Sequence, residues 1–360
     1  MGQVLKLNLY LIFIIIISLI GIEFCFKKGN KEYLSKTNTS CIKGIFILIV
    51  FYSHFTQYTA VNMSKDFLMY DFKVFLGQLM VTLFLFYSGY GIFESIKNKK
   101  NYIKQLPKKR IFKVWFQFAI AVSLFLILQL ILKNPDLNIK RILLSYVGWS
   151  GLGNSNWYIF GILLLYISSF LSFSIFNKEK DYRKAIILNY ILTIILILFL
   201  SVYKEIWWYN TLLCYNLGLS FSYHKKAIEE KLFNWKSYII ILFTTTFSFL
   251  VLYHLGKENF WYYELCAMSF CLLVVELTVI INLRSKVLKW FGDKLFWVYI
   301  LQRLPMIILV ELGYTSHPYR FALISFIVTI VLVLIVDFIS KNLDKLIVKQ
   351  KDKKIIKASS

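Results

Sequence analysis

The sequence predicts an all-α polytopic membrane protein with about eleven transmembrane helices. Of its 360 residues, 58% are hydrophobic, and the mean hydropathy is +0.63. A soluble chain of this length could not bury so much apolar surface. Apolar runs recur from one end of the sequence to the other, and only short charged segments separate them. The sequence therefore leaves no room for a large soluble domain.

Each predicted span is an apolar run close to the ~20 residues that cross a bilayer as a helix. Each later run follows a loop that contains Lys, Arg, Asn or Pro. In chain order the runs are 7–26, 42–60, 72–93, 111–132, 156–176, 185–203, 206–223, 237–255, 261–282, 295–312 and 319–340. We divide the chain into an N-terminal helix with its loop (1–41), a membrane domain (42–340) and a basic cytoplasmic tail (341–360).

The loops alternate in positive charge, and this alternation predicts their orientation. The odd-numbered loops and the tail are rich in Lys and Arg, whereas the even-numbered loops are poor in both. The positive-inside rule therefore places the odd loops and the C-terminus in the cytoplasm and the N-terminus outside. The run 7–26 could instead be a cleaved signal peptide, but its long apolar core and the lack of a small-x-small site favour a retained anchor.

Lys43 and His54 are the most informative pair in the chain. They lie eleven residues apart in the second predicted span, so a helix puts both on one face about 16 Å apart. If Lys43 marks the membrane surface, His54 lies near the middle of the apolar slab, where an ionisable side chain indicates a functional site. Histidine suits proton transfer near neutral pH. The alternatives are snorkelling for Lys43 and an interhelical hydrogen bond for His54.

Arg110 and Lys113 form a basic pair at the start of the fourth predicted span. Because they are three residues apart, they face the same way on an α-helix. Such a cluster at the cytoplasmic face fixes topology or contacts anionic lipid. It could equally hold the phosphates of a nucleotide-bearing substrate, for which Arg supplies a fork of donors.

Three further side chains could contact a substrate. Trp157 opens the fifth span, where it belongs to an interfacial aromatic belt or stacks on a sugar. Arg303 interrupts an apolar run, either lining a cavity or pairing between helices. Ser88 precedes Gly89 near the end of the third span, where small residues more often permit close helix packing.

Other classes of protein are excluded by what the sequence lacks. It contains no Walker loop, GxSxG elbow, HExxH pair or DxD-like pair in a large loop. Their absence argues against ATP-driven transport, serine hydrolysis, zinc proteolysis and nucleotide-sugar glycosyl transfer, in that order. The five cysteines lack metal-ligand spacing, so we expect no metal site. The basic residues are spread over the loops rather than gathered in one patch, so we expect no nucleic-acid partner.

In their order and spacing, these residues resemble the acyltransferase-3 family of integral-membrane acyltransferases, which includes O-antigen and capsule O-acetyltransferases. The family pattern is a basic residue and a histidine on the first core helix, then Ser-Gly, a cytoplasmic Arg-x-x-Arg, a Trp-aromatic pair and a late Tyr-Ile-Leu helix. The matching positions are Lys43 with His54, Ser88-Gly89, Arg110 to Lys113, Trp157-Tyr158 and Trp297 to Arg303. The likeness covers residues 42–340, and the family core of ten helices makes the first span an addition.

The resemblance implies that an acyl group, usually acetyl, is transferred from cytoplasmic acetyl-CoA to a hydroxyl of a cell-surface or lipid-linked polysaccharide. It implies a multi-pass protein of the bacterial plasma membrane, surrounded by membrane lipids. Lys43, Arg110 and Lys113 would hold the CoA phosphates. His54 would act as general base or accept the acyl group briefly.

On the acceptor side, the resemblance implies that Trp157, Arg303 and Ser88 contact the sugar. Lys43 and Lys113 depart from the family pattern, since each stands where Arg is commoner. A lysine keeps the attraction for phosphate but loses the fork of donors. The competing hypothesis is a flippase or carrier of lipid-linked glycans, which would need no acyl donor.

Overall fold

The computed structural model describes residues 7–26, 29–61, 64–256 and 259–358, with side chains up to residue 342. Within this part of the chain, eight helical segments are long and apolar enough to cross a membrane. They contain α2 (Lys36–Phe55), α4 (Leu79–Asn98), α6 (Lys113–Ile131), α8 (Trp157–Ile175), α9 (Tyr182–Tyr203), α12 (Trp235–Leu255), α13 (Phe260–Ile280) and α17 (Pro318–Ala358). The prediction of an all-α polytopic membrane protein is confirmed.

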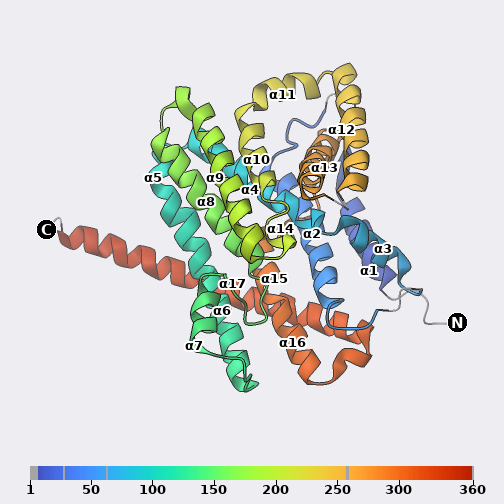
Figure 1. Ribbon diagram of the computed structural model, residues 1–360, viewed down its shortest axis with the longest axis vertical. Coiled ribbons are helices and arrows are strands. Elements are labelled where there is room, and N and C mark those ends of the chain that lie inside the picture. The colour runs from blue at the N-terminus through green and yellow to red at the C-terminus, as the bar shows by residue number, and fades with distance from the viewer. Residues whose placement is uncertain (1–6, 27–28, 62–63, 257–258, 359–360) are drawn as a thin grey trace.

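Helix α2, which carries Lys43 and His54, is the most enclosed of these segments. In its apolar window 83% of the residues are buried, compared with 11% in α12. In Figure 1, α12 stands at the edge of the molecule, and the C-terminal part of α17 projects beyond the other helices. The exposed apolar side chains of α12, such as Phe243 and Ile240, suit contact with lipid.

Three of the eleven predicted spans contain only shorter helices. The run 7–26 forms α1 (Asn8–Leu19) and the strand β1 (Ile22–Phe24), which pairs antiparallel with β2 (Ile281–Leu283). A positive φ of 82° at Gly21 separates helix from strand. The run 206–223 forms the 3₁₀ turn η3 (Ile206–Trp208) and α10 (Leu213–Tyr223).

The run 295–312 is divided into α15 (Leu295–Leu301) and α16 (Arg303–Glu311). Pro305 lies near the division, where it has no N–H to donate to the Leu301 carbonyl. The predicted span 72–93 also differs, since Gly77, with a φ of 46°, separates α3 (Phe67–Leu76) from α4. These breaks place polar and charged side chains between helix ends.

The remaining elements connect the long helices. Helix α6 continues α5 (Tyr102–Leu106) and a π-helical turn, η1 (Pro107–Phe112). The connections after them contain α7 (Ile139–Tyr146), the 3₁₀ turns η2 (Glu179–Asp181) and η4 (Tyr314–Ser316), α11 (Lys225–Leu232) and α14 (Lys286–Asp293).

Contacts between loops place the basic loops together at the Lys43 end of α2. Tyr33 packs against Phe233, and the Ser40 hydroxyl donates to Asp293, which joins the first loop to the seventh and ninth. Near the end of α4, Lys97 donates to the Ser222 carbonyl at the end of α10, and Phe93 packs against Tyr182 at the start of α9. At the His54 end, Asp66 accepts hydrogen bonds from the Leu7 amide and the Tyr319 hydroxyl. The segment from Leu7 to β1 therefore runs between the two ends, but its helix has only 12 residues and is shorter than the candidate membrane spans.

Two helix crossings bring backbones into direct contact through glycine. A Cβ atom on Gly44 of α2 would lie 2.0 Å from the Leu288 carbonyl oxygen of α14, and one on Gly292 of α14 would lie 1.8 Å from that of Ser40. Gly89 of α4 and Gly218 of α10 make the same kind of reciprocal crossing. Small residues permit this approach in membrane helices, and the expectation of close packing at Ser88-Gly89 is confirmed for the glycine.

Candidate active site

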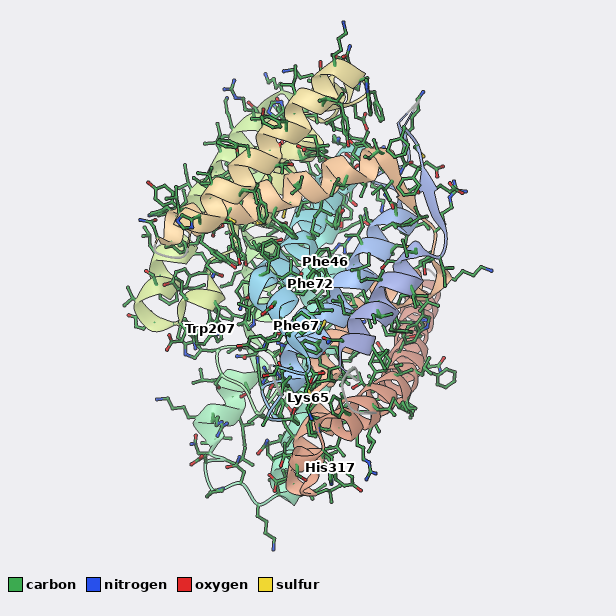
Figure 2. The ribbon with its side chains drawn as sticks, turned by 90° about the vertical axis from the view of Figure 1, so that its right-hand side faces the viewer. Phe46, Lys65, Phe67, Phe72, Trp207 and His317 are labelled. Carbon is green, nitrogen blue, oxygen red and sulfur yellow. The ribbon has the colours of Figure 1, made fainter. Side chains whose placement is uncertain are left out.

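A cavity of about 740 Å³ opens at the His54 end of α2. It is lined by the end of α2, the α3–α4 break, the segments before α8 and α10, and the α15–α16 pair. We call it the outer cavity. Figure 2 shows Lys65 and His317, from two loops at this end, towards the lower part of the view, with Phe46 of α2 nearer the centre.

His54 lies in the wall of the outer cavity and is 8% exposed. Its Nδ1 atom is enclosed and has no hydrogen-bond partner among the described residues. Nε2 is therefore the ring nitrogen available to a bound molecule. The ring of Tyr299 packs against the imidazole, with 6.1 Å between ring centroids. A neutral imidazole in this position can accept a proton from a hydroxyl group.

Two cationic side chains line the outer cavity beside His54. The guanidinium of Arg303 donates to the Tyr58 hydroxyl at 3.3 Å and to Gln57 Oε1. The ammonium of Lys73 donates to Thr56 Oγ1 at 2.9 Å. All three partners follow α2 directly, so the end of α2 positions both cations next to its own histidine.

A second cavity, of about 340 Å³, lies at the Lys43 end of the same helix. We call it the inner cavity. Lys36, Lys43 and Arg110 contribute three positive charges to its lining, and no Asp or Glu of the described residues lines it. The ammonium of Lys43 makes no hydrogen bond or ion pair with any residue that the structure describes, although Asp293 interacts with it electrostatically. Such a lining suits a polyanion such as a phosphate chain.

Arg110 reaches the inner cavity from the π-helical turn η1. Its Nε donates to the hydroxyl of Tyr102, one element earlier in the chain, at 3.1 Å. Single π turns inside α-helices are frequent at functional sites. Here the wider turn gives Arg110 and Lys113 different surroundings, since Lys113 is exposed and lines neither cavity.

A row of aromatic rings separates the two cavities. Tyr299 lines the outer cavity and lies 5.4 Å from the ring of Tyr158. Tyr158 lies 6.2 Å from the ring of Phe84, which lines the inner cavity. These three side chains come from α15, α8 and α4, and together we call them the partition.

A known protein family matches most of this chain. A family model described as an acyltransferase domain, Acyl_transf_3, matches residues 39–339. The chain belongs to the acyltransferase-3 family. No curated protein and no solved structure matches it significantly.

The structure distributes the predicted site residues of this acyltransferase over its two cavities. His54, Trp157 and Arg303 lie together in the outer cavity. Lys43 and Arg110 lie together in the inner cavity. Arg303 combines the two alternatives, since it lines the cavity and also bonds to Tyr58 and Gln57 after α2. The contribution of Lys113 to a donor site stays a prediction.

Ser88 lies apart from the other residues that we expected to contact the acceptor sugar. It lines the inner cavity beside Lys43 and Arg110, and its hydroxyl donates to the Phe84 carbonyl at 2.7 Å. Its depth in α4 places it at the level of the partition, on the side away from Trp157.

Sequence reasoning missed several residues of the outer cavity. Lys73 is the most important, because it adds a second cation beside Arg303. The sequence indicates Lys73 only by its position, as a lysine inside the largely apolar stretch Phe67–Leu76. Trp207 and Asn210 reach the cavity from the irregular segment before α10, which hydropathy assigned to a transmembrane helix.

Proposed function

We propose that this membrane acyltransferase transfers an acetyl group from acetyl-CoA to a hydroxyl of a cell-surface or lipid-linked polysaccharide. The protein acts in the bacterial plasma membrane, with its C-terminus in the cytoplasm. The observation that supports this proposal best is the pair of chemically different cavities at the two ends of α2. The inner one is lined by Lys36, Lys43 and Arg110, and the outer one combines His54 with two cations, tryptophans and amides.

On the donor side, Lys43 and Arg110 bind the phosphates of acetyl-CoA from the cytoplasm. The thioester supplies an activated acetyl group, and the pantetheine arm reaches towards the partition. Ser88, at the end of the inner cavity, is placed to contact this arm. Lys43 has no acid bonded to it among the described residues, so a phosphate adds a counter-charge without displacing one.

On the acceptor side, Trp157 supports a sugar ring with its apolar face. His54 Nε2 takes the proton of the sugar hydroxyl while the hydroxyl oxygen attacks the thioester carbonyl. The carbon–sulfur bond breaks, and the proton passes from His54 to the departing thiolate. The products are the acetyl ester and free CoA, and the imidazole returns to its neutral form. General-base catalysis of this kind contributes about 10²–10⁴-fold to a rate.

Label transfer from acetyl-CoA in membranes tests the proposal. We expect wild-type membranes to place radioactive acetyl on glycan, and His54→Gln to lower the rate by about 10²–10⁴-fold. His317→Gln is the matched control, because His317 is an exposed histidine in the loop before α17 (Figure 2). Near-normal transfer by a correctly inserted His54→Gln variant would refute the role of His54. A glycan that crosses the membrane without any label transfer would favour the flippase instead.

A further inference from the structure

The outer cavity has a pronounced charge imbalance. Arg303 and Lys73 contribute two positive charges to its lining, and neither Asp nor Glu is among the lining residues in the described part of the chain. A neutral sugar needs no such field, because its hydroxyl groups are satisfied by uncharged donors and acceptors. Two cations in an apolar bundle are costly unless a counter-charge accompanies them.

Neither cation finds that counter-charge within the described part of the protein. Arg303 is held by a tyrosine hydroxyl and an amide oxygen, and its Nε atom is enclosed without a hydrogen-bond partner. Lys73 is held by the hydroxyl of Thr56. Neither side chain makes an ion pair with a described carboxylate, so no described acid competes with a bound anion for either cation.

The rest of the lining suits a saccharide. Trp157 and Trp207 contribute apolar ring surfaces, and Asn156 contributes an amide. The amide nitrogen of Asn156 donates to the Gly148 carbonyl at 2.8 Å, which holds this side chain in place. Aromatic rings beside fixed amides bind sugar rings through their C–H faces and hydroxyl groups.

We propose that the acceptor of this enzyme is an anionic saccharide, whose negative group is bound between Arg303 and Lys73. The group is a carboxylate, as in a hexuronic acid, or a phosphate on the sugar. The inference rests on the proposed function, because it names the substrate class of the same outer cavity. With its charge held there, the sugar presents a neighbouring hydroxyl to His54.

Binding measured without an acyl donor tests this inference independently of catalysis. The quenching of tryptophan fluorescence reports binding, since tryptophans line the cavity. The probes are an oligosaccharide that contains glucuronic acid and its carboxyl-reduced counterpart, which keeps the other hydroxyl groups. We expect the acidic form to bind about 10- to 100-fold more tightly, the range for hydrogen bonds to charged groups. A hexose 6-phosphate, compared with the free hexose, distinguishes phosphate from carboxylate as the recognised group.

Charge-removing variants locate the effect. Arg303→Gln and Lys73→Gln should each remove most of the preference for the acidic form, and Arg303→Lys should retain part of it. Lys140→Gln is the matched control, because Lys140 is an exposed lysine on α7 outside the cavity lining. If Arg303→Gln fails to fold, the Lys73 variant and the loss of preference at high salt test the same charge.

The outcomes separate the two proposals. Equal binding of the acidic and carboxyl-reduced forms by the wild type would overturn the anionic acceptor, even if acetyl transfer to a neutral glycan were found. A preference for anions that both variants retain would also overturn it, because the anion would then bind elsewhere. A preference that depends on Arg303 and Lys73 supports the inference, even in a protein that transfers no acetyl group.

Discussion

Gly89→Ala is expected to destabilise this acyltransferase, whereas Gly91→Ala, two positions further along α4, is not. The added methyl group of Gly89→Ala would lie 2.0 Å from the Tyr215 carbonyl oxygen of α10. Ordinary contact begins near 3.4 Å, so the two backbones would have to separate by about 1.4 Å. At Gly91, nothing lies within 4 Å of the added atom.

The magnitudes follow from these distances. Overpacking at a tight contact costs about 1–3 kcal/mol, and replacing glycine by alanine inside a helix gains about 0.5–1 kcal/mol. Because the contact at Gly89 is with backbone, the upper part of the overpacking range, about 2–3 kcal/mol, applies there. Gly89→Ala should therefore lose about 1–2.5 kcal/mol, and Gly91→Ala should gain about 0.5–1 kcal/mol. The reciprocal contact of Gly218 with the Phe86 carbonyl leaves α10 little freedom to shift sideways.

Thermal unfolding of the purified proteins in one detergent measures the difference. We expect the Tm of Gly89→Ala to fall by a few degrees below the wild type and that of Gly91→Ala to stay equal or rise. Equal Tm values for the two variants would refute the argument, because the crossing would then tolerate a side chain. Gly218→Ala should reproduce the effect from the opposite helix.

The remaining predictions concern the two cavities and the topology. Lys43→Gln and Arg110→Gln should raise the KM for acetyl-CoA, because donor contacts are lost, and Lys113→Gln should have a smaller effect. Trp157→Ala should raise the KM for the glycan and leave donor affinity nearly unchanged, as titration of each substrate would show. Tyr158→Ala should open the partition and increase acetyl-CoA hydrolysis measured without acceptor. A reporter fused to the C-terminus should be active in the cytoplasm and silent outside.

Hydropathy predicted the long helices well because a bilayer-spanning helix must be apolar over most of its length. It could not separate one continuous helix from two short ones. The break at Gly77 depends on a positive φ, and the division at Gln302 lies near the missing N–H of Pro305. The mean hydropathy of each segment is the same whether its helix is continuous or broken. Only the backbone properties of glycine and proline indicate the breaks.

The same limit applies to the candidate site. Lys43 and His54 could be placed from the sequence, because one helix fixes their separation. The assembly of Trp157, Arg303 and Lys73 around His54 depends on contacts between different helices, which spacing along the chain does not encode. The different surroundings of Arg110 and Lys113 follow from a π turn, whereas the sequence pattern assumed an α-helix.

The partition determines which part of the bundle has to move during the proposed transfer. Phe84 lies on α4, which is fixed against α10 by the Gly89 crossing, and Tyr299 lies on α15, directly after α14 with its own crossing against α2. Tyr158 lies on α8, which packs against η1, the turn that carries Arg110. A phosphate bound by Arg110 therefore acts on the element that supports α8. We expect donor binding and the opening of the partition to be coupled through this contact, so that the thioester reaches His54 only when its own phosphates are in place.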